Sequence, residues 1–399
     1  MSQPRSPING GTPASLRTFR RMSLFQDTAV ARAAASPGSP RGTGKPDRAV
    51  TLWLWAIVAM VFAMVIVGGA TRLTESGLSI TQWRPIEGIV PPLSRADWLA
   101  AFARYRATPQ FAQLFPDMSL SQFKGIFLWE WSHRLLGRVI GLVFGVPLVW
   151  FWLKGRISAA LGRKLAVVFL LGGLQGAVGW WMVESGLTKR VEVAPERLAT
   201  HLLLASVLLI VLVSMAVGSQ PVAPEPNLPK RLRRTAAAIP FFVLAQIGLG
   251  ALVAGSRAGW TYNTWPLMDG RFVPPLPHLT SMRPFVRNFF ENVTTVQFDH
   301  RMMAYGLLAV VVAHALDARF SASGSAAMRR AAGLALLVAA QAMIGIMTLL
   351  LVVPVWAGLL HQAFAMIVLG FATLHWRRSR AQKEHTQEMS GREALFAAR

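Results

Sequence analysis

Residues 331–376 read AAGLALLVAAQAMIGIMTLLLVVPVWAGLLHQAFAMIVLGFATLHW and contain no Asp, Glu, Lys or Arg. A helix needs about 20 apolar residues to cross a bilayer, so this run is long enough for two crossings and too long for one. Pro354 lies near its middle, where it favours a turn. Two Arg residues precede the run at 329–330 and two follow it at 377–378. Both ends therefore lie on one side of a membrane, and the run is a helical hairpin.

The rest of the chain shows the same alternation of apolar runs and polar breaks. Hydrophobic residues make up 53% of the 399 positions and charged residues only 15%, below the rough quarter that is typical of globular domains. This composition excludes an ordinary soluble domain and predicts an all-α polytopic membrane protein with eight transmembrane helices. The predicted helices lie near 51–70, 134–153, 165–183, 198–217, 235–255, 300–317, 331–350 and 355–376.

Lys and Arg outnumber Asp and Glu by 41 to 18, a net charge of +23. In a soluble chain such an excess favours nucleic-acid binding. Here the basic residues lie mostly in short connections and tails between apolar runs, so they predict orientation in a lipid bilayer and no nucleic-acid partner. Cysteine is absent, which excludes disulfides, thiolate metal sites and iron–sulfur clusters. A metal or cofactor would have to be held by His, Met, carboxylate or backbone groups.

The positive-inside rule assigns the basic connections to the cytoplasm. The connection 154–164 carries only basic charges, and 218–234 carries four against a single acid, Glu225. Both termini then lie on the cytoplasmic side as well. The remaining connections face the periplasm or its mitochondrial equivalent, and the two long ones are rich in Trp, Pro and Gly, as in structured caps. These outward connections are 71–133, 184–197, 256–299 and 351–354.

The two ends of the chain are predicted to be tails. Segment 1–48 is rich in Arg, Ser, Pro and Gly, a bias shared by mitochondrial transit peptides. No clear amphipathic helix or processing site stands out, so we favour a disordered basic cytoplasmic tail and a bacterial inner membrane over a mitochondrial one. Residues 377–399 are expected to form a second cytoplasmic tail.

An internal repeat indicates that the chain is duplicated. GGATRLTESGLSITQWRPIEGIVPP (68–92) follows the first predicted helix, and GALVAGSRAGWTYNTWPLMDGRFVPP (250–275) follows the fifth. Both pass through Trp-Pro or Trp-x-Pro to a closing Pro-Pro. Further matches follow in the same order: WEWSHR (129–134) with VQFDHR (296–301), LQGAVG (174–179) with AQAMIG (340–345), and His201 with His361. We expect the first of these matches to open the second and sixth helices.

The repeat predicts two pseudo-symmetric four-helix bundles. They comprise residues 49–217 and 235–376, joined by a cytoplasmic linker at 218–234. Because four helices return the chain to its starting side, the two copies run parallel rather than inverted.

Four of the eight His residues occupy equivalent places in the two halves: His133 and His201, then His300 and His361. All four are expected near the outward ends of even-numbered helices. A His pair on facing helices of a four-helix bundle suits axial ligation of a haem iron, because the bundle core offers a flat apolar slot. Any one of them could instead be satisfied by a backbone carbonyl. The duplicated pattern and the cost of polar groups in a membrane favour iron ligands.

The other histidines fit this iron site less well. His314 lies 14 residues after His300, which is about 21 Å along a helix and too far to share its iron. His375 is likewise expected at a cytoplasmic end. His385 lies in the tail, and His278 is expected to be exposed in an external loop.

Arginines near the outward ends are candidate partners for haem propionates. Arg134 and Arg301 each follow the first His of their half. Arginines in the external connections could do the same or lie on a solvated surface: Arg72, Arg84, Arg257 and Arg271.

The two halves differ beside the first His. Glu130 lies three residues before His133 and shares its helical face, whereas Gln297 holds the matching place before His300. A carboxylate could take up protons or stabilise positive charge at an oxidised carbon, and a plain cofactor site needs neither. The alternative is that Glu130 only interacts with the helix dipole.

Taken together, these motifs resemble the haem A synthase family over residues 50–376. The segments that carry the resemblance are GGATRLTESGLSI (68–80), WRPIEGIVPP (83–92), FKGIFLWEWSHRLLGR (123–138), NTWPLMDGRFVP (263–274), FFENVTTVQFDHR (289–301) and GLLHQA (358–363). The resemblance implies an oxidoreductase that converts a methyl group of haem O to the formyl group of haem A, through an alcohol, for cytochrome oxidase biogenesis.

The resemblance also implies roles for individual residues. His133 and His201 would bind the substrate haem iron, with Glu130 as the catalytic acid, and His300 and His361 would be the axial ligands of a haem b cofactor. Some family members carry paired cysteines in the external loops, whereas this chain resembles the cysteine-free branch that includes alphaproteobacterial and mitochondrial enzymes. Expected partners are the haem O synthase and cytochrome oxidase assembly factors, and a homo-oligomer stays open.

Two other functions are compatible with parts of the pattern. A non-enzymatic di-haem b-type cytochrome would explain four His ligands, but not the change from Glu130 to Gln297. A transporter would explain the repeat, but it predicts charged or broken helices at the membrane midplane, which the sequence does not show.

Overall fold

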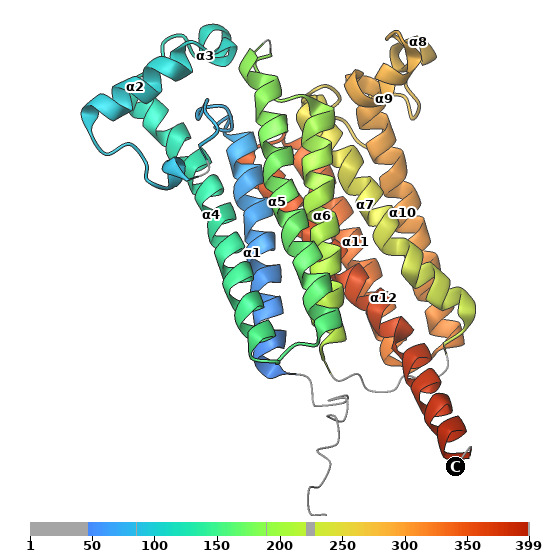
Figure 1. The fold of residues 1–399 in the computed structure, drawn as a ribbon. Helices are drawn as coiled ribbons and strands as arrows, with labels where there is room; N and C mark the ends of the chain where they lie inside the picture. Colours follow the sequence, from blue (N-terminus) through green and yellow to red (C-terminus); the bar gives the residue numbers. More distant parts are fainter. Residues whose placement is uncertain (1–46, 85, 189, 221–227, 398–399) are drawn as a thin grey trace, which may run out of the picture. The chain divides into compact units, whose positions relative to one another are not determined.

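The computed structural model describes residues 47–84, 86–188, 190–220 and 228–397, with side chains as far as residue 380 (Figure 1). Within these ranges there is no β-strand, and eight helices are long and apolar enough to cross a membrane. They are α1 (Arg48–Leu73), α4 (Leu120–Leu153), α5 (Ala159–Thr188), α6 (Pro195–Gly218), α7 (Lys230–Gly255), α10 (Val293–Ser321), α11 (Ala326–Leu350) and α12 (Val355–Ala397). The predicted all-α class with eight crossings is confirmed. Residues 1–46 of the predicted amino-terminal tail lie outside the described residues.

Two helices begin earlier than predicted, so the expectation that WEWSHR and VQFDHR open their helices is wrong. Helix α4 begins at Leu120 because Ser119 caps it and forms a capping box with Gln122. Helix α10 begins at Val293, after the cap Asn292. His133 and His300 therefore lie inside long helices. Helix α12 also continues beyond its predicted end at 376, through the expected carboxy-terminal tail.

Helix contacts within each half form a closed ring. In the first half α1 contacts α4 and α6, and α5 contacts the same two helices. In the second half α7 and α11 each contact both α10 and α12. The helices α4 and α6 are thus opposite corners of one ring, and α10 and α12 are opposite corners of the other. This contact pattern is what two four-helix bundles require, and their pseudo-symmetry stays a prediction.

The main hydrophobic core lies where the two halves meet. Helix α6 contacts α12 and α7 of the other half, and α1 also contacts α12. Buried aliphatic side chains from these helices pack with those of α10 and α11, among them Val213, Ile239, Leu334 and Leu369. Gln362 on α12 also donates a 2.7 Å hydrogen bond to the Val65 carbonyl on α1. The halves therefore share one packed interior.

The two long outward connections fold into caps at the same end of the helices (Figure 1). The first contains η1 (Glu87–Ile89), α2 (Arg95–Arg106) and α3 (Pro109–Leu114). The second contains η2 (Ala258–Trp260), α8 (Leu276–Leu279), η3 (Phe285–Arg287) and α9 (Asn288–Glu291). Aromatic side chains join the first cap to α4, where the rings of Tyr105 and Phe123 stack with centroids 5.4 Å apart. This packing explains why α4 extends outward beyond the apolar segment.

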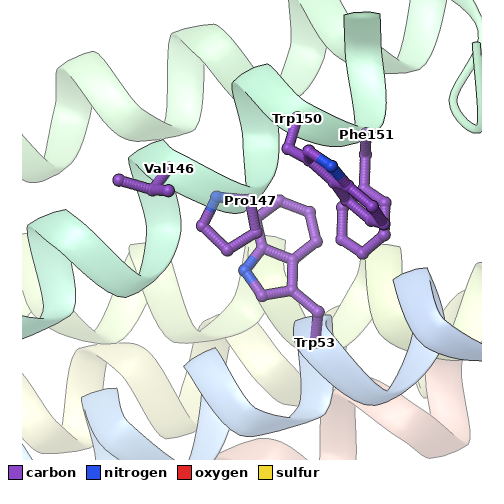
Figure 2. A pocket seen from close by; sticks show the side chains of 5 residues that line it. All are labelled: Trp53, Val146, Pro147, Trp150 and Phe151. Atoms are coloured by element: carbon purple, nitrogen blue, oxygen red, sulfur yellow. The ribbon is translucent and has the colours of Figure 1, made fainter. Parts of the chain in front are cut away.

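Pro147 interrupts the hydrogen bonding of α4 inside the membrane, and α1 compensates. Proline has no N–H, so the Val143 carbonyl one turn earlier loses its helical donor. The indole of Trp53 on α1 donates to that carbonyl at 2.8 Å. Figure 2 shows Trp53 beside Pro147 in an apolar pocket between α1 and α4, which Trp150 and Phe151 also line. An unsatisfied backbone group in lipid is costly, so this bond stabilises the α1–α4 contact.

Candidate functional site

The four histidines singled out by the repeat lie on the opposite corners of the two helix rings. His133 and His201 lie on α4 and α6, and His300 and His361 lie on α10 and α12. The His300 and His361 rings face each other with centroids 6.4 Å apart and planes at 81°. The structure thus brings the second predicted pair together and places the first pair on the facing helices α4 and α6.

The spacing of the second pair suits a metal ion between the rings. A metal held by one nitrogen of each ring at about 2 Å would place the centroids roughly 6 Å apart. The 6.4 Å separation of the His300 and His361 rings matches this value. These two residues would hold a haem iron, which proteins commonly bind through histidine.

Glutamines on the neighbouring helices hold three of the four rings, a feature that the sequence analysis missed. Nε2 of Gln175 lies 3.1 Å from His201 Nδ1, and Nε2 of Gln246 lies 3.0 Å from His300 Nδ1. Nε2 of Gln341 lies 3.1 Å from Nδ1 of His361. Each of these amides also donates to the backbone carbonyl of its histidine, at 3.0, 3.1 and 3.0 Å. The matched hexapeptides at 174–179 and 340–345 could have indicated these glutamines, because both contain Gln four residues before Gly.

The same three amides contain orphaned acceptors. Oε1 of Gln175, Gln246 and Gln341 is buried and has no hydrogen-bond partner in the described part of the chain. Iron ligation through Nε2 leaves the proton of a neutral imidazole on Nδ1, which then needs an acceptor. In this structure the amide nitrogen, not the oxygen, of each glutamine lies beside Nδ1. This donor set fits haem iron, which is bound in proteins by neutral imidazole.

Glu130 is buried at 2% exposure and its carboxylate is fully engaged. Oε2 accepts from Ser79 Oγ at 2.7 Å and from the Ile80 backbone N–H at 2.8 Å. Oε1 accepts from Arg134 Nη2 at 2.6 Å and from its Nε at 3.1 Å. Arg134 in turn donates to the carbonyls of Ile80 and Gln82. Glu130 and Arg134 therefore bind the backbone of the segment that follows α1 and hold a carboxylate three residues from His133.

In the second half Gln297 and Arg301 make equivalent bonds to the backbone of the segment that follows α7, without a carboxylate. Gln297 Nε2 donates to the Ala258 carbonyl at 2.8 Å. Arg301 donates to the carbonyls of Tyr262 and Thr264 at 2.8 and 3.0 Å, and to Gln297 Oε1 at 3.3 Å. Arg301 Nε is buried and has no partner among the described residues. The guanidinium of Arg134 is thus paired with a carboxylate, whereas the hydrogen bonds of Arg301 within the described residues all go to neutral groups.

The arginines of the external connections have different surroundings. Arg72 and Arg257 both pair with Glu192, Arg72 at 2.8 Å, and Arg257 also pairs with Glu75 at 2.5 Å. These contacts join the outward ends of the two halves. The remaining two predicted candidates are exposed, Arg84 in a surface pair with Glu87 and Arg271 in the second cap.

A second histidine pair lies towards the opposite end of α10 and α12. His314 Nε2 and His375 Nε2 are 2.9 Å apart, and Thr235 Oγ1 lies 2.6 Å from His314 Nδ1. His314 is therefore separate from the His300 pair, as predicted. The pairing itself was missed, although both partners lie 14 residues after a predicted ligand. His278 is exposed, as predicted, and the side chain of His385 lies outside the described part.

Comparisons with known proteins identify the family of this chain. A family model described as cytochrome oxidase assembly protein matches residues 51–373. The haem A synthase of Methylobacterium sp. (strain 4-46) is 57% identical over 343 residues, which cover 86% of this chain and 95% of that protein. The haem A synthase of Beijerinckia indica subsp. indica is 53% identical over 351 residues, 88% of this chain and 97% of that protein. That of Mesorhizobium japonicum is 50% identical over 361 residues, 90% and 99% of the two chains. With matches of this length and identity, the chain belongs to the cytochrome oxidase assembly protein family.

Proposed function

We propose that this chain is a haem A synthase, an oxidoreductase that converts haem O to haem A through an alcohol intermediate. The relatives named above carry that activity in their names and match most of this chain. The single observation that carries the proposal is the contrast between two like histidine pairs. One pair lies beside the buried carboxylate Glu130, and the other lies beside the neutral amide of Gln297.

We place the substrate in the amino-terminal half, residues 49–217. His133 and His201 bind the iron of haem O in this proposal. The carboxylate of Glu130 lies on the same face of α4 as His133 and is held by Arg134 and Ser79. Paired with Arg134, the Glu130 carboxylate is suited to stabilise positive charge developing at the methyl carbon. It serves as the catalytic residue that also receives protons released by the oxidation.

We place a haem b cofactor in the carboxy-terminal half, residues 235–376, with His300 and His361 as axial ligands. When bound, haem b supplies one-electron transfer. The two rings face each other at the required spacing and are held by Gln246 and Gln341. Their short contacts with α7 and α11 keep the ligand geometry fixed, as a permanently bound group requires.

We assign propionate contacts chiefly to Arg301. Its Nε is buried without a partner in the described region, and its other nitrogens donate to neutral groups. A buried guanidinium without a carboxylate is favourable only if an anion pairs with it. Arg134 is the matching candidate in the other half, but Glu130 already neutralises its charge.

The chain spans a membrane several times, and we propose a bacterial inner membrane with both termini in the cytoplasm. The basic connections at 154–164 and around 218–234 support this orientation. The caps and the four proposed iron ligands then lie towards the periplasmic side. Haem O synthase and oxidase assembly factors are proposed partners, because one supplies the substrate and the others receive the product.

Extraction of pigments tests the function. Membranes that contain this chain and a haem O source should accumulate haem A or its alcohol precursor, detected by chromatography. A di-haem electron-transfer cytochrome would yield only haem b and unchanged haem O, and that result would overturn the proposal.

A further inference from the structure

Each proposed iron ligand packs against a glycine of the preceding long helix. The distances from the position of a glycine Cβ to the nearest ring atom are 2.9 Å at Gly68 for His133 and 2.9 Å at Gly179 for His201. They are 3.0 Å at Gly250 for His300 and 2.7 Å at Gly345 for His361. No larger residue fits at these four positions without moving the ring. The contact therefore recurs four times along the chain.

The residue four positions before the glycine is not the same at all four places. It is Gln175, Gln246 and Gln341 before the last three glycines, and each of these amides contacts its histidine. Before Gly68 it is Met64. A thioether cannot donate a hydrogen bond and is only a weak acceptor. Among the described residues, no hydrogen-bond partner is found for the His133 ring.

The His133 ring also has the opposite orientation. At Gly179 the order of approach is His201 Cε1 at 2.9 Å, Nδ1 at 3.5 Å and Nε2 at 3.7 Å. At Gly68 it is His133 Nε2 at 2.9 Å, Cδ2 at 3.5 Å and Cε1 at 3.8 Å. A half-turn about the Cβ–Cγ bond exchanges Nε2 with Cε1 and Nδ1 with Cδ2, and it converts one pattern into the other. The His133 ring thus occupies the same place but is turned over.

The hydrogen-bond partner is what distinguishes the two orientations of an imidazole, since the ring shape is nearly the same in both. Three rings have a glutamine amide nitrogen at Nδ1, which for His201 and His300 also lies 3.3 and 3.4 Å from Nε2, and Cε1 is the ring atom nearest to the glycine. The His133 ring lacks that partner, and its Nε2 is the ring atom nearest to Gly68. No amide therefore fixes which of its two orientations this ring adopts.

From this difference we infer that Gln175, Gln246 and Gln341 are positioning residues for three iron ligands, and that Met64 makes His133 the ligand that releases and rebinds the substrate iron. This inference rests on the proposed function. A cofactor that stays bound needs two fixed ligands, and His300 and His361 both have a glutamine. A substrate that enters and leaves needs one bond that opens readily, and its site has only one glutamine. Ligand-orienting contacts are commonly worth about 10–100-fold in metal affinity.

The first test supplies the missing amide. Full-length protein loaded with haem O is mixed with excess apomyoglobin, and transfer of haem is followed by absorbance. Met64→Gln should slow loss of haem O by about 10-fold or more relative to wild type. Met64→Leu, which has a similar size and no amide, should leave the rate unchanged. Equal rates for the Gln and Leu variants would overturn the inference.

The reverse exchange tests the same idea without adding a polar group to the membrane. Gln175→Met should speed the loss of haem O by about 10-fold, because both ligands of the substrate then lack an amide. Gln246→Met should leave that rate unchanged, since Gln246 contacts only the other pair. An unchanged rate in Gln175→Met would count against a positioning role.

A spectroscopic readout separates positioning from simple packing. Gln341→Leu should convert part of the haem b signal from low-spin to high-spin in electron paramagnetic resonance. Gln341→Glu should stay low-spin and lower the midpoint potential, because a carboxylate oxygen in place of the amide nitrogen would accept from Nδ1–H and make the ligand more basic. Spectra of both variants identical to wild type would contradict the inference.

Failure of the inference is distinguishable from failure of the proposed function. If His133→Ala and His300→Ala retain all haem, these residues are not ligands, and both the function's ligand assignment and the inference fall. If those variants lose haem while the Met64 and Gln175 exchanges have no effect, only the inference falls.

Discussion

The replacement Glu130→Gln separates catalysis from structure, because the second half already contains this arrangement with a glutamine. The Glu130 carboxylate accepts four hydrogen bonds, two of them from Arg134. A glutamine keeps one acceptor oxygen and loses the charge, so we expect a stability loss of about 1.5–3 kcal/mol, the usual contribution of a hydrogen bond to a charged group. Glu130→Ala would leave a largely buried guanidinium unpaired and should cost about 3–5 kcal/mol.

Turnover should fall far more than stability. General acid–base groups contribute roughly 10²–10⁴-fold to rates, so Glu130→Gln should reduce haem A formation at least 100-fold. The assay is chromatography of haem extracted from membranes supplied with haem O, with thermal unfolding measured on the purified protein. The control Glu87→Gln makes the same change at an exposed ion pair and should alter neither quantity. Full turnover in Glu130→Gln, or equal loss of both haems, would refute the assignment.

Three further perturbations have defined outcomes. Gly345→Ala places a Cβ 2.7 Å from the His361 ring and should lower haem b content, measured by the pyridine haemochrome, whereas Gly333→Ala, with its nearest contact at 3.5 Å, should not. The ion pair with Arg156, followed by the backbone N–H groups of Ala49 and Val50, lowers the pKa of Asp47 below its ordinary 3.8. Asp47→Asn keeps a residue that can cap α1 and should reduce thermal stability at pH 7 by about 0.2–1 kcal/mol for the lost ion pair, and the difference should shrink as the pH falls below 3.8 and through the lower native pKa. Glu192→Gln removes the anion shared by two arginines at the outward ends of the halves and should lower the unfolding temperature, and an unchanged temperature would show that this network contributes nothing.

The sequence predicted the helices that hydropathy controls and missed what depends on packing between helices. The eight apolar runs and the histidine pairs could be read from composition and from the repeat. The start of α4 at Leu120 was missed because residues 120–133 are less apolar, although the Ser-x-x-Gln capping box at 119–122 is a signal that the sequence does contain. The contact of this segment with Tyr105 joins distant parts of the chain and could not be predicted from its own pattern.

The candidate site shows the same division. His133, His201, His300 and His361 follow from the duplicated order of residues, but the contacts of Gln175, Gln246 and Gln341 depend on the register between adjacent helices. A periodic pattern of apolar residues predicts which face of a helix is buried, but it does not predict the axial register of that helix against its neighbour. The hydrogen bond from the Ile80 backbone N–H to Glu130 was missed for a related reason, since it joins an irregular segment to a helix.

The division of labour between the two halves is the central claim, and pigment analysis of His133→Ala and His361→Ala tests it most directly. Each protein is purified from cells that supply haem O and haem b, and the extracted haems are separated by chromatography. The account predicts that His133→Ala retains haem b and lacks haem O and haem A, whereas His361→Ala loses haem b and still binds haem O. If both variants lose the same pigment, or if each retains the haem that it should lose, the assignment of substrate and cofactor to separate halves is wrong.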